Sequence, residues 1–324
     1  MFLEKEGKLI YSYDGETVCI EAWGKDALRV RATKNRSFTG RDWALEAKDA
    51  HAGEVEIFED PSAKGGAFAN MYEGTDTSYG KITNGKLHAV IDSGSVITFY
   101  HEDGRVLLKE HFRRLRDEES MPLNIMGREY SNGVGDNFRI VARFVARKGE
   151  KIFGMGQYQQ HELDLKGCML ELAQRNSQVS VPFYLSSIGY GFLWNNPGVG
   201  QVMFANNGTE WVTESGKEID YLVIAGDTPA EIEENYMTLT GKPPMMPEYG
   251  MGFWQCKLRY WNQEQLLSVA RKYKELGVPL DVIVVDFFHW TKQGEFKFDP
   301  KYWPDVPRIK GDGNSGCCVG MADR

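Results

Sequence analysis

The chain has 324 residues, of which 42% are hydrophobic and 12% aromatic, so it can form one large core or two ordinary ones. The formal net charge is −8 and acidic and basic residues are mixed along the chain, which argues against a basic face for nucleic acid. No apolar run approaches the length of a membrane span, and the opening stretch, MFLEKEGKLIYSYDGE, has no apolar core of signal-peptide length. We therefore expect a globular, cytoplasmic protein with no nucleic-acid or membrane partner.

The five cysteines show no C-x-x-C spacing anywhere in the chain. Zinc knuckles need such spacing, and disulfide frameworks are typical of small secreted domains with many paired cysteines. The cysteine pattern therefore predicts no metal site and no disulfide framework, and it fits a reducing compartment.

Residues 1–225 have the pattern of an all-β region. Short runs of β-branched and aromatic residues are separated by Gly, Asp and Asn. At residues 14–15, 84–85 and 103–104, an Asp-Gly or Asn-Gly pair stands between strand-like residues, which is the strongest short-range signal for a hairpin. Many short strands at this spacing predict a β-sandwich over residues 1–225.

Residues 226–247 are predicted to be a helical and Pro-rich linker. Thr228 can cap a helix, Pro229 suits its first position, and Glu231 provides the acid of a capping box. The run GKPPMMP at residues 241–247 then ends the helix and favours a stiff, extended segment.

Residues 248–305 have the pattern of strand, helix and strand. The run GMGFWQC at residues 250–256 predicts a first strand, and residues 262–276 predict a helix with one apolar face. The next segment, LDVIVVDFFHW at residues 280–290, has four consecutive β-branched residues, which are typical of a parallel strand buried on both faces. This order is the repeating unit of a (β/α)8 barrel.

The second predicted strand ends in a carboxylate followed by aromatic side chains. In α/β folds, groups at the carboxyl ends of parallel strands bind ligands. Asp286 alone can also be explained as the polar cap of the next loop. Beside Phe288, His289 and Trp290 it forms an apolar platform with one hydrogen-bond acceptor, an arrangement that suits sugars. We therefore predict that these four residues bind substrate.

The segment PPMMPEYGMGFWQCKLRYWNQEQLLSVARKYKELGVPLDVIVVDFFHW, followed by FKFDPKYWPD, resembles the start of the catalytic barrel of glycoside hydrolase family 31, the α-glucosidase and α-xylosidase family. The Pro-rich run, W-Q-x-K-x-R-Y, P-L-D and W-P-D occur in the family's order. Upstream, KIFGMGQY and VPFYLSSIGYGFLWNNP resemble the family's amino-terminal, galactose-mutarotase-like β-sandwich. The resemblance implies a β-sandwich followed by the start of a (β/α)8 TIM barrel.

The resemblance also implies a function. The family contains retaining exo-acting enzymes that hydrolyse terminal α-linked xylose or glucose residues of oligosaccharides without a metal or cofactor. In that comparison, Asp286 would bind hydroxyl groups of the sugar in the −1 subsite and would be neither nucleophile nor acid/base. Phe288 stands where many of the family's α-glucosidases carry an acid, which favours xylosides. A homo-oligomeric parent protein remains open.

The resemblance brings residues of the sandwich toward the barrel mouth. Gln157, Arg175 and Asn176 are candidates for lining the sugar site, and ordinary turn chemistry is an equal alternative for them. Lys257 and Arg259 follow the first barrel strand and either approach the same mouth or form a structural ion pair.

Residues 306–324 differ from the family's pattern. A barrel needs ~250 residues, and a retaining glycosidase needs two catalytic carboxyl groups, which the family carries on later strands. We therefore expect a truncated barrel, no catalytic residue within this sequence and no activity of the chain alone. Gly and Cys cluster in residues 306–324 without helical period, which predicts a disordered, aberrant tail from either a reading-frame slip or a genuine terminus. The alternative function is a carbohydrate-binding β-sandwich without catalysis.

Overall fold

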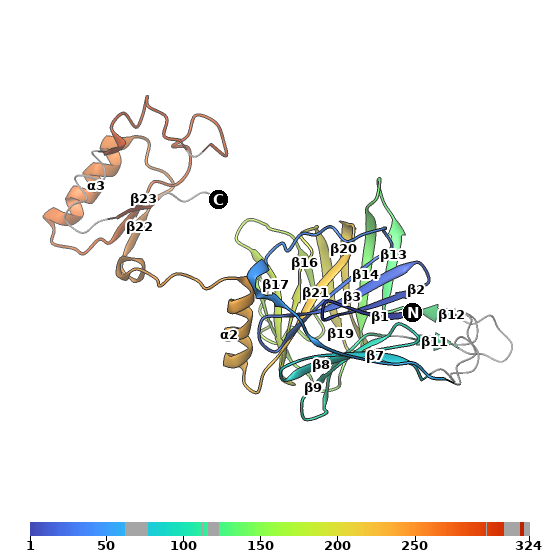
Figure 1. Cartoon of the computed structure of the whole chain (residues 1–324). Coiled ribbons are helices and arrows are strands. Elements are labelled where there is room, and N and C mark those ends of the chain that lie inside the picture. The colour runs from blue at the N-terminus through green and yellow to red at the C-terminus, as the bar shows by residue number, and fades with distance from the viewer. Residues whose placement is uncertain (62–76, 112, 116–122, 296, 308–317, 321–324) are drawn as a thin grey trace. The chain divides into compact units, whose positions relative to one another are not determined.

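A computed structural model describes residues 1–61, 77–111, 113–115, 123–295, 297–307 and 318–320 (Figure 1). The chain divides into two compact units, Met1–Lys242 and Pro243–Arg324, here named the sandwich unit and the barrel unit. Among the described residues, no helix is both long and apolar enough to cross a membrane.

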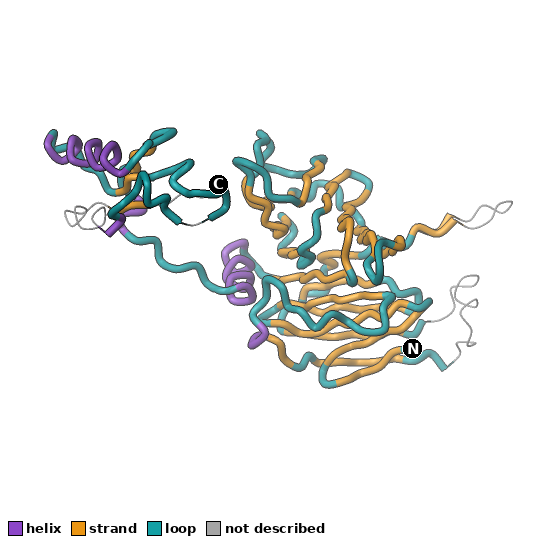
Figure 2. The backbone as a smooth tube through the Cα atoms, turned by 90° about the horizontal axis from the view of Figure 1, so that it is seen from above, coloured by secondary structure: helices purple, strands orange, loops and turns teal. Residues whose placement is uncertain are grey.

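The described strands of the sandwich unit pair only antiparallel, and Figure 2 shows them together with the loops that connect them. Its largest sheet has the order β1-β2-β3-β4-β21-β18-β17-β15, with β5 paired to β3. These strands are β1 (Phe2–Lys5), β2 (Lys8–Tyr13), β3 (Glu16–Trp23), β4 (Ala27–Thr33), β5 (Ala50–His51), β15 (Ile152–Gln157), β17 (Val179–Ser186), β18 (Tyr190–Trp194) and β21 (Ile219–Ala225). A short 3-10 helix, η1 (Ala47–Asp49), precedes β5.

Two five-stranded sheets and one hairpin complete the sandwich unit. One sheet has the order β10-β9-β8-β7-β6 and the other β13-β14-β20-β19-β16, while β11 pairs with β12. These strands are β6 (Glu54–Phe58), β7 (Tyr79–Asn84), β8 (Leu87–Asp92), β9 (Ile97–His101), β10 (Val106–Lys109), β11 (Arg113–Leu115), β12 (Leu123–Ile125), β13 (Arg128–Asn132), β14 (Phe138–Phe144), β16 (Met169–Leu172), β19 (Gly200–Ala205) and β20 (Gly208–Gly216).

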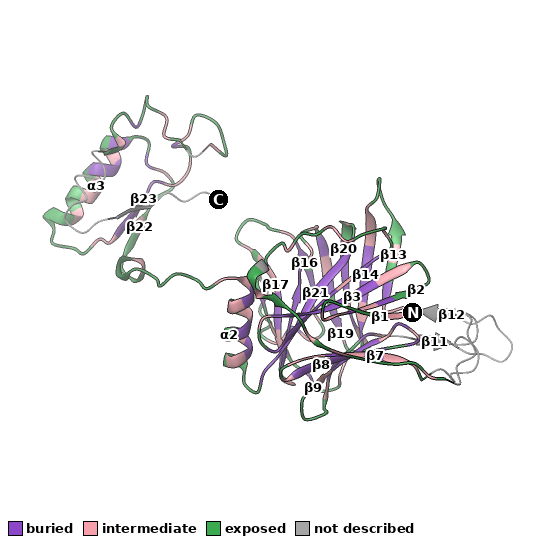
Figure 3. Cartoon of the chain, in the orientation of Figure 1, coloured by how far each residue is buried: buried purple, intermediate pink, exposed green. Residues whose placement is uncertain are grey.

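The main core lies between the large sheet and the two five-stranded sheets. Its buried side chains include Ile20 of β3, Ile82 of β7 and Trp211 of β20, one from each sheet. Figure 3 shows this buried layer along strands such as β20 and β21. The predicted sandwich is therefore confirmed, because alternating apolar residues from facing sheets close one common core.

The first of the three turns that carried the strand prediction has the expected geometry. Asp14 and Gly15 both have positive φ angles, 48° and 74°, between the paired residues Tyr13 and Glu16. A two-residue turn of this kind matches the twist of its strands.

Helix α2 (Pro229–Thr240) covers the other face of the large sheet. Thr228 caps it, since its Oγ1 accepts a hydrogen bond from the Glu231 amide at 3.2 Å. Ile232 and Leu239 are buried against β18 and β21 in a second apolar cluster. The helix expected to lie in a linker is therefore part of the sandwich unit, because its apolar face is buried there.

The barrel unit is a small parallel sheet with one helix. Strands β22 (Trp254–Cys256) and β23 (Val282–Val284) pair in parallel, as predicted, and η2 (Glu248–Met251) precedes them. Helix α3 (Gln263–Glu275) is capped by Asn262, whose side chain accepts a hydrogen bond from the Gln265 amide. The helix packs Leu266 and Leu267 against Ile283 and Val285.

A third parallel strand was not expected from the sequence. Strand β24 (Cys318–Gly320) pairs with β23 along its whole length, within the segment for which disorder was predicted. The hydrogen bonds between paired strands use only backbone groups, so three residues can form a strand without alternating apolar side chains. Residues 308–317 and 321–324 of the predicted tail lie outside the described residues.

Candidate functional site

The carboxylate of Asp286 is held at the carboxyl end of the parallel sheet. Its Oδ2 lies 3.2 Å from the Sγ of Cys256, which donates from the end of β22. Its Oδ1 accepts a hydrogen bond from the Phe287 amide at 2.9 Å. Both oxygens are therefore oriented from within the barrel unit, and each retains a lone pair that can accept from a ligand hydroxyl. The sequence reasoning missed Cys256, although parallel strands β22 and β23 must end at the same edge.

An exposed aromatic platform lies next to this carboxylate. Phe288 is 58% exposed, and its ring centroid is 5.4 Å from that of Phe287 and 5.9 Å from that of Trp290. The guanidinium of Arg259 stacks on Phe288 at 4.5 Å and on Trp261 at 3.7 Å. Arg259 thus approaches the predicted site as a cation between two rings.

The backbone of this platform is unusual. Asp286 and Phe288 have φ angles of 60° and 64°, in the left-handed region that side chains other than glycine seldom adopt. For a bulky residue such as Phe288 this conformation is strained by about 1–3 kcal/mol, and such strain is frequent at ligand sites.

His289 does not take the place predicted for it. Its side chain is only 1% exposed, and its ring packs against Trp290 and Phe298. Its Nδ1 lies 2.8 Å from the backbone oxygen of Asp286, and its buried Nε2 has no hydrogen-bond partner among the described residues. The expected contact between His289 and substrate is therefore replaced by a contact that positions the Asp286 backbone. Sequence pattern alone does not tell which ring of an aromatic cluster points inward.

The three candidates from the sandwich unit lie together at one strand end. Gln157 is the last residue of β15 and pairs with Val179 of β17. Val179 follows the turn that contains Arg175 and Asn176. All three candidate side chains are exposed. Arg175 donates two hydrogen bonds to Glu171, at 2.9 and 2.6 Å, so turn chemistry accounts for this side chain. Binding and turn chemistry both remain open for Gln157 and Asn176.

The part of the chain that the structure describes contains no group of three or more His, Cys, Asp or Glu residues that could hold a metal ion. Around Asp286, Cys256 contacts the carboxylate and His289 contacts the backbone oxygen.

Two family models match the chain. Residues 17–202 match the glycosyl hydrolase 31 N-terminal galactose mutarotase-like domain. Residues 243–312 match the glycosyl hydrolases family 31 TIM-barrel domain.

Curated relatives and solved structures agree with these matches. An uncharacterised family 31 glucosidase, ORF2, of Pseudescherichia vulneris is 41% identical over 314 residues, which cover 94% of this chain and 56% of that protein. The α-xylosidase of Saccharolobus solfataricus is 38% identical over 184 residues, which cover 53% of this chain and 25% of that protein. The crystal structure of a GH31 α-xylosidase from a soil metagenome, complexed with xylose, superposes with a TM-score of 0.85 at 42% identity and covers 99% of this chain and 46% of that one. The chain thus spans about half the length of the first of these relatives and of the solved structure.

Proposed function

This chain belongs to glycoside hydrolase family 31, and we propose that it is part of a retaining exo-α-glycosidase that removes terminal α-linked xylose or glucose from oligosaccharides. The observation that carries the proposal is the Asp286 carboxylate, fixed at the carboxyl end of β23 beside the exposed ring of Phe288. A carboxylate next to an aromatic face offers a sugar both a hydrogen-bond acceptor and an apolar surface.

In this proposal Asp286 binds and does not react. Its free lone pairs accept hydrogen bonds from sugar hydroxyls, while Cys256 and the Phe287 amide keep both oxygens in place. Holding the sugar in one orientation removes much of the entropic barrier to reaction.

The two reacting carboxyl groups of a retaining enzyme are about 5–5.5 Å apart, one as nucleophile and one as acid/base. We place them on barrel strands other than the three described strands β22, β23 and β24. The chain alone is therefore expected not to turn over glycosides. Because two carboxyl groups suffice for this chemistry, the proposal calls for no metal or cofactor.

The proposed preference is for xylosides. Phe288 follows Asp286 by two residues and is exposed, and in this proposal its ring would crowd the hydroxymethyl group of glucose. One such group changes transition-state binding by only about 1–3 kcal/mol, so the preference is partial. Several relatives of the chain carry the name α-xylosidase, which supports the same choice.

The test uses a longer family 31 protein that carries the same DFFHW segment. We expect it to hydrolyse p-nitrophenyl α-xyloside faster than the glucoside and to release the α-anomer first, as NMR can follow. Replacing the counterpart of Asp286 by alanine should lower kcat/KM at least ~100-fold, a loss equal to about 2.7 kcal/mol. Initial release of the β-anomer, or an equal rate on the glucoside, would contradict the mechanism or the preference, respectively.

A further inference from the structure

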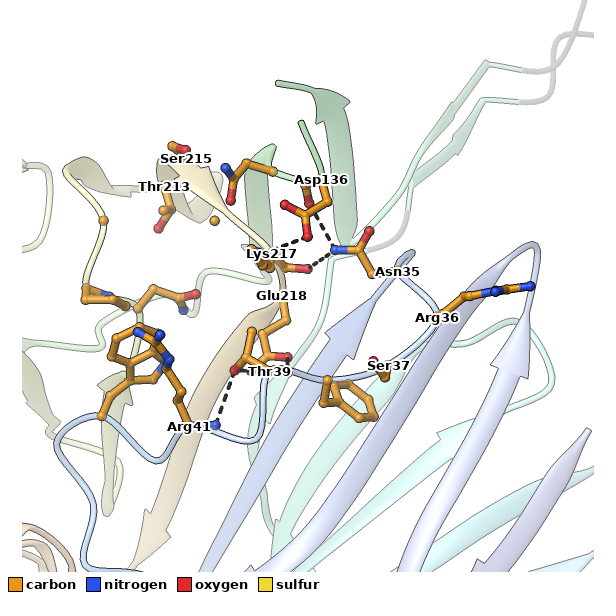
Figure 4. A pocket seen from close by; sticks show the side chains of 17 residues that line it. Asn35, Arg36, Ser37, Thr39, Arg41, Asp136, Thr213, Ser215, Lys217 and Glu218 are labelled. Carbon is orange, nitrogen blue, oxygen red and sulfur yellow. Dashed lines mark hydrogen bonds and ion pairs between the residues drawn. The ribbon is translucent and has the colours of Figure 1, made fainter. Parts of the chain in front are cut away.

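A second candidate site lies wholly within the sandwich unit, at the end of the large sheet where β20 turns into β21 (Figure 4). This sandwich-end cavity has a volume of about 650 Å³, which is within the usual range for small-molecule sites. Four segments that are distant in sequence line it, at residues 35–43, 136–137, 196–198 and 213–218.

Two of the acidic groups around the cavity already have hydrogen-bond partners, while the Arg41 guanidinium lies over the Trp43 ring. Lys217 donates to Asp136 at 2.7 Å, and Glu218 accepts from both the amide and the hydroxyl of Thr39 at 2.8 Å. The side chain of Arg36 extends away from the other labelled residues in Figure 4. A polar ligand without net charge suits a lining that carries both signs of charge and pairs Lys217 with Asp136.

The remaining polar lining consists of hydroxyl and amide groups. Ser215 and Thr213 of β20 lie on one side of the cavity in Figure 4, and the turn before β14 contributes Asn137. Ser215 is exposed and lines the cavity, so its hydroxyl can reach a ligand. Hydroxyl and amide groups of this kind both donate and accept, as the hydroxyls of a sugar require.

Trp43 gives the cavity an aromatic wall. Its side chain is 43% exposed, and the Arg41 guanidinium lies 5.2 Å from its ring centroid. Its φ angle is 54°, a left-handed conformation that is rare for a bulky residue and costs about 1–3 kcal/mol. An exposed tryptophan in a strained backbone contributes little to the core, so its presence points to a ligand.

Arg29 holds the loop that carries Trp43 through hydrogen bonds. Arg29 is fully buried and donates to the Asp42 carboxylate at 2.8 Å and to the Arg41 carbonyl at 2.9 Å. The same guanidinium donates twice to Asp220 of β21, at 3.0 and 2.7 Å. The backbone before Trp43 is therefore tied to the large sheet through one buried ion pair.

Asn195 ties down the same loop on the other side of the tryptophan. Its Oδ1 accepts from the Ala44 amide at 3.3 Å, and its Nδ2 donates to the Asp42 carbonyl at 3.1 Å and to Asp220 at 2.9 Å. The residues on both sides of Trp43, Asp42 and Ala44, are thus held by hydrogen bonds. A wall that is already ordered loses little entropy when a ligand binds.

We propose that the sandwich-end cavity binds a neutral oligosaccharide, with one sugar ring on Trp43 and its hydroxyl groups on the Ser215 and Asn137 side chains. Pyranose rings have apolar C–H faces and a polar rim, which match an aromatic wall beside hydroxyl and amide groups. This site is separate from Asp286, so its binding does not depend on the function proposed above.

The experiment is calorimetric titration of the purified chain with a xyloglucan heptasaccharide and, separately, with isomaltotriose. We expect binding of at least one of them, weakened at least tenfold by Trp43→Ala and weakened also by Ser215→Ala. Phe58→Ala is the matched control, because Phe58 is 42% exposed in the same unit and does not line the cavity. It should leave the affinity unchanged. Circular dichroism of each variant checks that the fold is intact.

Asp286→Ala separates the two sites. If the sandwich-end cavity is the site, this variant keeps the affinity of the parent chain. Loss of binding in Asp286→Ala together with unchanged binding in Trp43→Ala would overturn the proposal and leave the barrel site as the ligand's location. Absence of binding to both oligosaccharides, or binding of inorganic phosphate in their place, would overturn it as well.

Discussion

The sandwich unit and the barrel unit differ in how completely each encloses its own core. In the sandwich unit every residue of β21 is buried, since the strand has neighbours on both sides, a five-stranded layer on one face and α2 on the other. In the barrel unit β23 is buried while β22 exposes two of its three residues. Large apolar side chains are exposed around β22, among them Met251, Trp254 and Leu258.

This difference shows what parallel strands require. Each strand of a barrel needs a neighbour on either side and a helix outside before its apolar residues are covered. The sandwich unit meets these needs with its own strands and α2, whereas the described part of the barrel unit has only three strands and one full helix. The exposed edge and apolar surface of such a sheet favour association. The two units should therefore differ measurably in stability and in solvent access.

The largest expected effect concerns the buried ion pair of the sandwich unit. Arg29→Ala leaves the Asp220 carboxylate buried without its partner and should lower the free energy of unfolding by about 3–5 kcal/mol. Lys272→Ala removes an exposed ion pair with Glu275 in α3 and should change it by less than about 0.5 kcal/mol. Urea titrations followed by tryptophan fluorescence measure both. Equal effects of the two variants would show that the buried network is not needed.

The same pair predicts a pH dependence. Burial raises the pKa of Asp220 to about 6, although Arg29 and Asn195 oppose the shift. A carboxyl group whose pKa is higher in the folded protein binds protons on folding, so its contribution to stability falls as the pH rises from about 4 to about 6. Without Arg29 the pKa rises further, and the deficit of Arg29→Ala should therefore be larger at pH 8 than at pH 5. A deficit that is independent of pH would contradict this account.

Hydrogen exchange of the backbone amides should show a difference in local stability between the two units. The amides of β21 should exchange only through global unfolding, whereas those of β23 should exchange through local opening, about 1000-fold faster, because the barrel unit has a small core. That ratio corresponds to about 4 kcal/mol. Mass spectrometry of peptic peptides provides the rates. Equal protection of the two strands would mean that the barrel unit is as stable as the sandwich.

The reactivity of individual cysteine thiols should also differ between the two units. Burial, together with the nearby Glu21 carboxylate, raises the pKa of the Cys19 thiol to about 11, so only about one thiol in a thousand is ionised at pH 8. Cys256 in the barrel unit is exposed. Iodoacetamide at pH 8 should therefore modify Cys256 about 100-fold faster than Cys19, and the Cys19 rate should rise about tenfold per pH unit until about pH 11. Peptide mapping measures both rates, and rapid labelling of Cys19 would show that its strand opens.

The sequence was sufficient for features that depend on local chemistry. Hairpin turns, the Asn262 cap of α3 and the position of Asp286 after a buried strand all follow from neighbouring residues. The conformation of the Trp43 loop could not be predicted in this way, because the residues that hold it are far apart in sequence. Arg29 and Asp220 are separated by 191 residues. The buried orientation of His289 was also out of reach, since it depends on which aromatic rings close the core around it.

The smallest effect concerns two exposed aromatic residues, one in each unit, that share a left-handed backbone. Trp43 has φ 54° and Phe288 has φ 64°. Glycine adopts this region freely, whereas alanine pays about 1–2 kcal/mol for it. At both positions the glycine variant should therefore be more stable than the alanine variant, by about 1 kcal/mol, which is the reverse of the order at an ordinary strand position such as Phe58.

The measurement that reveals the stability difference between the glycine and alanine variants should not be the same in the two units. The loop of Trp43 is anchored by Arg29 and Asn195, so Trp43→Gly should raise the melting temperature relative to Trp43→Ala by about 2–4 °C. Phe288→Gly and Phe288→Ala should melt together with the parent chain and differ only in the exchange of β23 amides, because the barrel unit opens first. If the alanine variant were the more stable one at position 43, the backbone there would not be strained, and the strained aromatic wall would no longer support a sugar site in the sandwich.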